Sequence, residues 1–219
     1  GYCQLTLPYH YLLERLEVER RGGKIAPTFR GILPTYRDAA ARDTTNFAEF
    51  LDEQSFSARL DKRLAQAELE LANYVSIDQI MKAGYPPPQR KDMQVRIPHR
   101  IDKAALLELY APAREFLAPF LVHEDDVNAS RDGDDWLYEA AQGVMLDKNV
   151  GRRPDVTSSS PIRLPANAYR WGVVKAYQSR VGADSPPTRM DPETEELIRG
   201  PREERGSEYG STSGRPRKC

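Results

Sequence analysis

The amphipathic pattern that begins at Glu53 is the feature of this sequence that most restricts its fold. Apolar side chains recur every three or four residues, at Phe56, Leu60, Leu64, Ala67, Leu71 and Tyr74. This spacing predicts a helix from Glu53 to about Ala83 whose apolar face must pack against the rest of the chain. Asp52 can cap its start, and Gly84 with the prolines after it ends it. The charged residues on its other faces are expected to be exposed: Arg59, Asp61, Lys62, Arg63 and Glu68.

Shorter elements are expected on either side of this helix. The leucines among residues 12–16 form one apolar stripe in a charged stretch, which predicts a helix that stops at the glycine pair 22–23. Residues 24–45, interrupted by prolines and a glycine, predict a structured loop that leads into a short helix. Residues 136–138, and Val173–Val181 with its β-branched and aromatic side chains, each predict a strand.

The segment after Asp102 predicts two further helices. Asp102 is placed to cap residues 103–110, and Pro112 is expected to open a second helix that runs to about Val122, because proline suits a first helical turn. The most apolar run of the chain, residues 116–122, includes a proline and is far shorter than the about 18–20 residues that a membrane span needs. No membrane association is therefore predicted.

The charge balance argues against general affinity for nucleic acid. Lys and Arg number 32 and Asp and Glu number 33, which gives a net charge of −1, whereas binding to a phosphate backbone needs a net basic surface. The first residues show no basic segment followed by an apolar one, so no signal peptide is expected. Cys3 and Cys219 form no metal or disulfide pattern, which favours a reducing compartment.

The common catalytic motifs are missing from the sequence. His10, His99 and His123 are scattered and lack the spacing of a metal site, so we expect each to be a structural or surface residue. No G-x-S-x-G elbow, Walker loop or dinucleotide-binding glycine motif occurs. The sequence therefore predicts no metal ligand and no phosphate-binding loop of the familiar kinds.

Hydroxyl, amide and arginine side chains near glycines remain as candidates for a binding site. They are Arg30, Arg42, Gln142, Thr157–Ser159 and Ser211–Arg215. Arginine binds carboxylates and phosphates in a bidentate fork, hydroxyls add neutral donors, and an amide can donate to and accept from a base edge. This set indicates a site for a phosphorylated, base-containing ligand together with a carboxylate. The competing interpretation is that these are ordinary loops.

Six segments resemble motifs of the adenylosuccinate synthetase family, in the family's order. Residues 138–147 read Y-E-A-A-Q-G-V-M-L-D and are similar to its F-E-G-A-Q-G-x-x-L-D signature. The other five are similar to T-G-R-G-I-G-P-A-Y at residues 28–36 with D-x-x-x-R at Asp38 and Arg42, V-T-S-S at 156–159, x-K-A-Y-x-T-R-V-G at 174–182, the end of F-P-T at 187–188, and E-[YF]-G-x-T-T-G-R-x-R at 208–217. Their order and spacing argue against a chance resemblance.

The resemblance implies an α/β fold. It would be part of a P-loop-NTPase-like, mostly parallel sheet flanked by helices and incomplete at both ends. Residues 1–219 would form a single partial domain with a helical insert over about residues 46–123. The family's catalytic aspartate, its Mg²⁺-binding glycine-rich loop and its catalytic histidine are expected upstream of Gly1, and its guanine-recognising K-x-D downstream of Cys219.

The resemblance also implies a reaction. The γ-phosphoryl group of GTP moves to O6 of IMP, and the α-amino group of L-aspartate then displaces that phosphate at C6, giving adenylosuccinate on the route to AMP. Mg²⁺ and GTP are the implied cofactors, but their main binding motifs are absent from this chain, so the fragment is not expected to be active alone. The implied assembly is a cytoplasmic homodimer.

Individual residues take their implied roles from the matched motifs. Thr28 and Thr157 match threonines that hold the IMP phosphate, and Arg42 matches an arginine that reaches the IMP phosphate of the other subunit. Gln142 matches the catalytic glutamine beside the hypoxanthine, and Val181 matches a residue that lines the ribose. The residues that match the loop gripping the aspartate carboxylates are Thr212, Ser213, Arg215 and Arg217.

Three family glycines are replaced in this chain, by Phe29, Leu33 and Ala140. Glycine permits a positive φ or a close approach to a ligand, so these changes alter the expected pocket. Two alternatives to an IMP ligase therefore stay open. One is a relative that acts on another purine nucleotide, and the other is a non-catalytic nucleotide-binding remnant.

Overall fold

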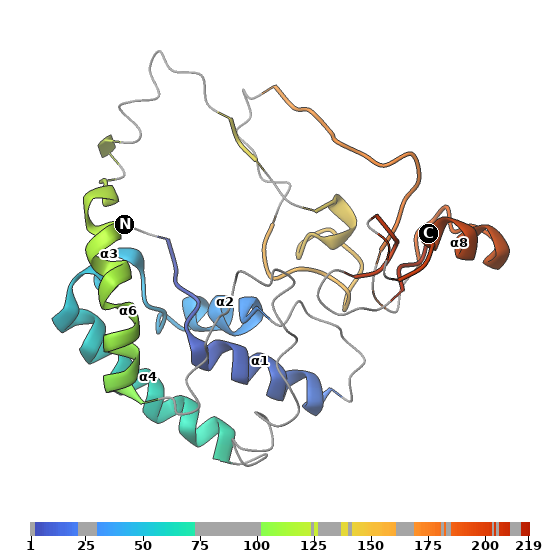
Figure 1. Cartoon of the computed structure of the whole chain (residues 1–219). Helices are drawn as coiled ribbons and strands as arrows, with labels where there is room; N and C mark the ends of the chain where they lie inside the picture. The colour runs from blue at the N-terminus through green and yellow to red at the C-terminus, as the bar shows by residue number, and fades with distance from the viewer. Residues whose placement is uncertain are drawn as a thin grey trace. The chain divides into compact units, whose positions relative to one another are not determined.

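The computed structural model describes residues 3–21, 30–72, 102–123, 125–126, 137–139, 142–160, 169–180, 182, 185–202, 204, 206–210 and 216–219 (Figure 1). Contacts within the chain group into two compact units. Unit 1 comprises Gly1–Glu17, Arg30–Tyr85 and Gln94–Glu139, and unit 2 comprises Val18–Phe29, Pro86–Met93 and Ala140–Cys219.

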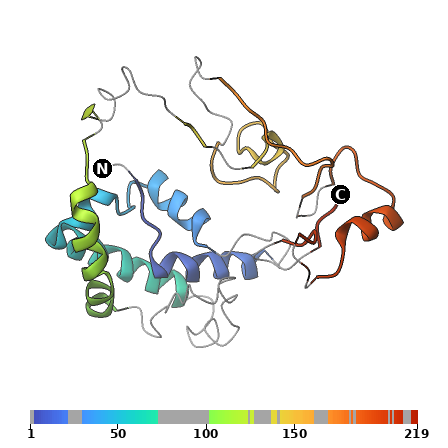
Figure 2. The same cartoon turned by 45° about the horizontal axis from the view of Figure 1, so that its top comes forward.

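The described part of unit 1 is helical. Its elements are α1 (Pro8–Arg20, whose last turn belongs to unit 2), α2 (Ile32–Ala40), α3 (Phe47–Leu51), α4 (Glu53–Ala72), α6 (Lys103–Leu117) and the 3₁₀ turn η1 (Ala118–Phe120). Its core is one cluster of buried apolar side chains from α1, α3, α4 and α6, and Figure 2 shows α1 and α4 lying side by side around it. Among these side chains, Phe56 contacts Phe50 edge to face at 5.1 Å between ring centroids.

The long amphipathic helix is confirmed over the part that the structure describes. α4 begins at Glu53, where the Asp52 carboxylate accepts the N–H of Ser55 at 2.8 Å as its cap. The apolar stripe predicted from the sequence is buried at Phe56, Leu60, Leu64, Ala67 and Leu71. The predicted continuation to Ala83 lies outside the described residues.

One charged residue of α4 is buried, although the sequence predicted that all of the named charged residues are exposed. Arg63, predicted to be exposed with the other charged residues, is 1% exposed and forms an ion pair with the buried Asp38. Charge alone placed it on the solvent face, whereas a carboxylate on α2 supplies a buried partner that the spacing within α4 cannot reveal. The helical period gives the face that packs, and not the polar contacts made along its border.

Pro112 does not open a new helix, as the sequence predicted, but lies inside α6. Pro112 is itself exposed, and the apolar face of α6 continues on both sides of it, with Leu106 buried and Tyr110, Ala113 and Leu117 packed on the same core. A proline inside a helix costs roughly 3 kcal/mol, so burial of these side chains on both sides of it must outweigh that penalty.

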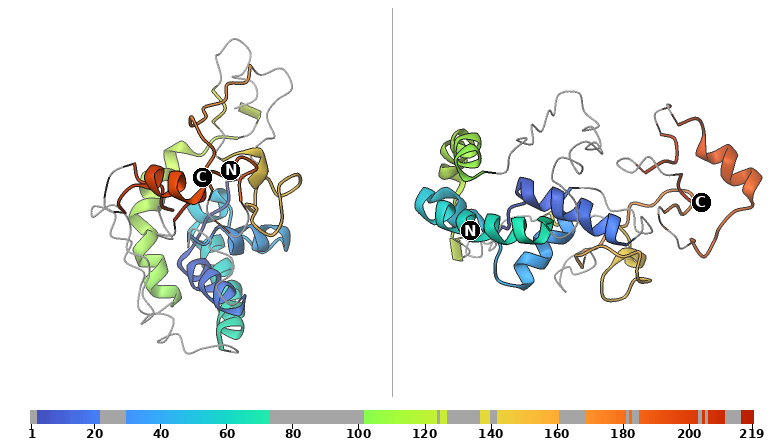
Figure 3. Two further views of the ribbon diagram at one scale, coloured as in Figure 1. Left: turned by 90° about the vertical axis from the view of Figure 1, so that its right-hand side faces the viewer. Right: turned by 90° about the horizontal axis from the view of Figure 1, so that it is seen from below.

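The Asp102 cap is confirmed, since its carboxylate accepts the N–H of Ala105 at 2.8 Å. Figure 3 shows α6 from the side and from below.

Two short helices had no prediction although the sequence carries their signals. α3 begins with a capping box, in which Asn46 accepts the N–H of Glu49 and Glu49 accepts the N–H of Asn46. In unit 2, α8 (Pro192–Arg199) begins with an Asp191 cap followed by proline at the first position. Helices α1 and α2 are confirmed where the leucine stripe and the short helix after residue 30 were expected.

The described part of unit 2 contains α8 and the 3₁₀ turn η2 (Val144–Leu146), with isolated bridges Arg180↔Lys218 and Tyr209↔Pro216 in place of a strand ladder. The strand predicted over Val173–Val181 is wrong for residues 173–179, and the strand predicted over residues 136–138 is wrong for residues 137 and 138, the two that the structure describes. β-branched and aromatic composition favours a strand only where a neighbouring strand pairs with it. Among the described residues, no helix is long and apolar enough to cross a membrane.

Candidate functional site

Arg42 lies just past the C-terminus of α2. Its N–H donates to the carbonyl oxygen of Ala39 at 3.0 Å, and the N–H of Asp43 donates to the carbonyl oxygen of Asp38 at 2.8 Å. These two bonds form the Schellman motif that ends many helices, and the motif needs a left-handed backbone at the position where glycine is most common. Arg42 meets that need with a φ of 65°, and its side chain is exposed.

Gln142 also has a left-handed backbone, with a φ of 73°. Arg42 and Gln142 are the non-glycine residues with positive φ in the part of the chain that the structure describes. A Cβ atom makes this conformation cost roughly 1–2 kcal/mol, and such strain gathers at functional sites. The backbone therefore points, independently of any motif, to two residues that the motifs assign to substrate.

Two hydrogen bonds, at Asp147 and at Leu146, hold residues 157–160 against the segment that follows Gln142. The Asp147 carboxylate is fully buried and accepts the hydroxyl of Ser160 at 2.6 Å. Beside it, the N–H of Thr157 donates to the carbonyl oxygen of Leu146 at 2.7 Å. Two segments that match separate family motifs are thus held side by side within unit 2.

The turn after Asp147 leaves no room for a side chain at Gly151. A Cβ atom there would meet the carbonyl oxygen of Met145 and lie 2.5 Å from that of Asp147, whereas at Gly143 it would meet nothing within 4 Å. We expect Gly151→Ala to loosen this loop by about 1–3 kcal/mol, because backbone atoms must move. Amide hydrogen exchange over residues 144–159 should be faster in Gly151→Ala and unchanged in the control Gly143→Ala. Equal protection in both variants would contradict this packing.

A second cluster in unit 2 centres on Glu208, which is 3% exposed. Its carboxylate accepts bonds from the Lys175 ammonium and, at 2.7 Å, from the Tyr177 hydroxyl. Burial favours the neutral acid, but the bonds from Lys175 and Tyr177 hold the pKa of Glu208 below its ordinary value. The bond to Glu208 raises the pKa of Tyr177 to about 12. Glu208 thereby ties the K-A-Y segment to the base of the C-terminal loop.

The two ends of that loop are paired. Tyr209 bridges to Pro216, and Arg180 bridges to Lys218 through bonds of 2.9 and 3.0 Å. Arg180 also donates from Nη2 to the carbonyl oxygen of Asp155 at 2.9 Å, next to the V-T-S-S segment. Hydrogen bonds therefore join four of the matched motifs of unit 2 in two pairs, and the Arg180 bond connects the pairs through Asp155, the residue before V-T-S-S.

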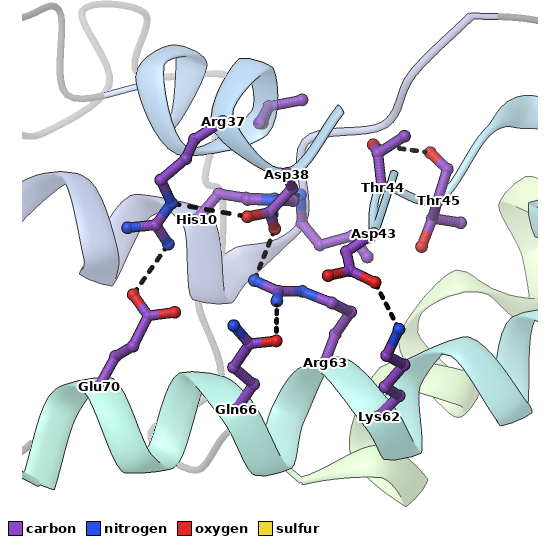
Figure 4. Close-up of polar contacts among 12 residues, drawn as sticks. His10, Arg37, Asp38, Asp43, Thr44, Thr45, Lys62, Arg63, Gln66 and Glu70 are labelled. Atoms are coloured by element: carbon purple, nitrogen blue, oxygen red, sulfur yellow. Dashed lines mark hydrogen bonds and ion pairs between the residues drawn. The ribbon is translucent and has the colours of Figure 1, made fainter. Parts of the chain in front are cut away.

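In unit 1, a buried polar cluster joins α1, α2 and α4 (Figure 4). The Asp38 carboxylate lies 3.0 Å from His10 Nε2 and 2.7 Å from an Arg63 guanidinium nitrogen. The N–H of Leu7 donates to His10 Nδ1 at 2.8 Å, so Nδ1 carries the lone pair and Nε2 the proton that Asp38 accepts. Arg63 also lies over the ring of Tyr9, 5.5 Å from its centroid. His10 is thus a structural residue, as the sequence predicted, and it is held neutral.

The neutral state of His10 makes stability depend on pH. Burial lowers the pKa of His10, against the opposing effect of Asp38, so its contribution is complete above its ordinary value of 6.5 and is lost as the pH falls. We expect the free energy of unfolding to decrease between pH 7.5 and 5.5, and less steeply in His10→Asn. Glu14, whose pKa burial raises, contributes in the opposite direction in both proteins and cancels in the comparison. His123→Asn, at a 70% exposed side chain, is the control. Denaturant titrations at several pH values measure the free energy of unfolding. If it changed equally with pH in the wild type and in His10→Asn, the assignment would be contradicted.

The described residues include Arg42 in unit 1 and Gln142, Thr157 and Arg217 in unit 2. The predicted site residues outside the described part are Thr28, Val181, Thr212, Ser213 and Arg215. The Nε of Arg217 donates to the carbonyl oxygen of Tyr209 at 3.2 Å, so part of its guanidinium is engaged within the protein. No role was predicted for Asp147 or Glu208, although both stand in matched motifs.

The donor set for a metal is missing from the described residues. They bring together no group of three His, Cys, Asp or Glu side chains. Mg²⁺ usually binds through one or two carboxylates together with the phosphates of its substrate.

Comparison with known proteins agrees with the motifs. The family model of adenylosuccinate synthetase matches residues 1–219. The adenylosuccinate synthetase of Heliobacterium modesticaldum is 34% identical over 232 residues, which cover 100% of this chain and 48% of the relative. That of Streptococcus gordonii is 36% identical over 232 residues, covering 99% and 47%. The fold matches the structure of fully ligated adenylosuccinate synthetase from Plasmodium falciparum with a TM-score of 0.70 at 23% identity, over 99% of this chain and 48% of that one.

The chain belongs to the adenylosuccinate synthetase family. The resemblance drawn from the motifs is thereby confirmed. The chain spans about half the length of the curated relatives that it matches.

Proposed function

We propose that this chain is the part of a GTP-dependent adenylosuccinate synthetase that binds IMP and L-aspartate. The observation that carries the proposal is the left-handed backbone of Arg42 and Gln142. Folding alone favours glycine at such positions, so an arginine and a glutamine there are best explained by what their side chains bind. Family membership supplies the identity of the ligand.

Within this proposal, Arg42 binds the phosphate of the IMP that is held by the other subunit. The hydroxyls of Thr28 and Thr157 donate hydrogen bonds to the phosphate of the IMP in their own subunit. Gln142 contacts the hypoxanthine and helps to hold O6 for phosphorylation, and Val181 lines the ribose. An exposed arginine on a fixed turn suits a dianionic phosphate, because its guanidinium can form two parallel charged hydrogen bonds.

L-Aspartate is proposed to bind at the loop between the paired ends Tyr209 and Pro216. Its carboxylates would accept hydrogen bonds from the hydroxyls of Thr212 and Ser213 and from the guanidinium groups of Arg215 and Arg217. The hydrogen bonds around Glu208 support this role, because they fix the base of the loop that would bind the carboxylates.

The reaction follows from the chemistry of these ligands. Oxygen O6 of IMP attacks the γ-phosphorus of GTP and GDP leaves; the amine of aspartate then attacks C6 and phosphate leaves. GTP and Mg²⁺ are proposed to bind mainly through other parts of the protein. The parallel sheet, the single partial domain with its insert at about residues 46–123, the homodimer and the cytoplasmic location belong to the same proposal.

The test uses the protein expressed from its intact reading frame. GTP consumption should require IMP and L-aspartate together, and adenylosuccinate should form in equal amount with the phosphate released. Calorimetry with IMP, AMP and GMP identifies the nucleotide. Turnover with another purine nucleotide favours a relative of changed specificity, and nucleotide binding without turnover favours a non-catalytic remnant. Either result would overturn the proposal.

A further inference from the structure

Asp38 is the centre of the buried cluster in Figure 4. It is 2% exposed, and its two buried partners come from different helices: His10 of α1 is 0% exposed and Arg63 of α4 is 1% exposed. Arg37 of the same helix lies further away, with its Nε 3.7 Å from the carboxylate. One side chain of α2 is therefore held from two sides by groups that solvent does not reach.

A buried charge pair is weak evidence of stabilisation. Removing two charges from water costs several kcal/mol in general, and apolar residues of similar volume often serve a fold as well. In some proteins such a pair instead fixes a geometry, and at Asp38 the ion pair with Arg63 acts together with the hydrogen bond from His10. The position of Asp38 relative to α1 and α4 is accordingly well defined.

The main chain of Asp38 belongs to the turn that carries Arg42. Its carbonyl oxygen accepts the N–H of Asp43 at 2.8 Å and so closes the Schellman motif around the left-handed residue. On the far side of that turn, the Asp43 carboxylate lies 2.5 Å from Lys62 of α4. Arg42 thus stands between two residues that are both attached to α4, and the Asp38 attachment is the buried one.

We propose that Asp38 is a positioning residue for Arg42. Its buried ion pair and hydrogen bond fix the C-terminal end of α2, and this sets the direction in which the exposed Arg42 side chain leaves the turn. The inference rests on the proposed function, since it gives Arg42 its phosphate ligand. Asp38 itself touches no substrate and acts through the backbone between residues 38 and 43.

The test compares KM for IMP with kcat in the protein from its intact reading frame. Asp38→Asn keeps the shape of the side chain and removes its charge, and we expect KM for IMP to rise by at least about tenfold with kcat within about twofold. KM for GTP should be unchanged. Asp61→Asn, the same substitution at a 62% exposed carboxylate of α4, is the control and should change neither constant.

A double-mutant cycle separates positioning from a general structural role. In the Arg42→Leu protein, Asp38→Asn should have no further effect on KM for IMP, because the residue through which it acts is gone. A loss of the same size in both backgrounds would overturn the proposal, and so would an unchanged KM in the single variant. If Arg42→Leu itself leaves KM for IMP unchanged, it is the proposed role of Arg42 that fails.

Asp38→Asn leaves Arg63 buried without a carboxylate, and the variant must be shown to fold by circular dichroism. Where it does not fold, Asp38→Asn combined with Arg63→Met removes both charges and takes its place in the same cycle. The combined variant is expected to show the same rise in KM for IMP, and an unchanged KM would overturn the proposal.

Discussion

Replacing Arg42 with glycine is expected to make the protein more stable and to weaken its binding of IMP. Glycine adopts the left-handed backbone of residue 42 without the steric cost of a Cβ atom, so the free energy of unfolding should rise by about 1 kcal/mol. A charged hydrogen bond contributes about 1.5–3 kcal/mol, so its loss should weaken IMP binding by about 10- to 100-fold. Denaturant unfolding and calorimetry with IMP measure the two effects on the same preparation.

Two further variants make the expected result specific. Ala41, one residue earlier, has a right-handed backbone with a φ of −77°, so Ala41→Gly should lower stability by up to about 1 kcal/mol and leave IMP binding unchanged. Arg42→Leu keeps the strain and loses the guanidinium, so it should weaken binding without a gain in stability. A loss of stability in Arg42→Gly would contradict the strain argument.

Replacing Arg63 with methionine is expected to destabilise unit 1 by about 3–5 kcal/mol. The substitution keeps an unbranched side chain in the core but leaves Asp38 buried without its nearest cationic partner, which lies 2.7 Å away in the wild type. Domains are typically stable by only about 5–15 kcal/mol, so this one change should remove a large share. The shift in the denaturant midpoint measures it.

The neighbouring residue supplies the control for Arg63. Lys62 forms an ion pair with Asp43 but its side chain is 61% exposed, and Lys62→Met should change stability by no more than about 1 kcal/mol. A similar loss in both variants would show that burial does not distinguish the two pairs. Asp38→Asn in the Arg63→Met protein should recover part of the loss, because no unpaired buried charge remains.

Local patterns in the sequence predicted α1, α2 and α4 and the start of α6, and they failed where a distant residue decides the outcome. The spacing in α4 identified the buried stripe from Phe56 to Leu71, because helical period and burial are directly related. The burial of Arg63 depends on Asp38, and the course of α6 through Pro112 depends on the core it covers. The strand predicted over Val173–Val181 was wrong for residues 173–179 for a similar reason, since strand pairing needs a partner elsewhere in the chain.

In the candidate site, too, the sequence indicates residues whose role depends on their own chemistry and misses those whose role depends on distant segments. Motifs assign substrate roles to Arg42, Gln142 and Thr157, whose chemistry is visible in the residue type, and these roles stay predictions. They gave no role to Asp147 or Glu208, whose importance lies in the distant segments that each joins. Backbone strain at Arg42 and Gln142 could not be read from the sequence, because neither residue is a glycine and the usual signal of a left-handed turn is missing.

The arginine that closes α2 has a consequence for laboratory evolution of this chain. A library selected only for folding, by display or by protease resistance, has no reason to retain a side chain at a position that glycine occupies more easily. Such a selection should enrich glycine at residue 42, and under the proposed role of Arg42 the best-folding survivors would bind IMP more weakly. Adding IMP binding to the selection should restore arginine, so the residue recovered at this single position reports which pressure was applied.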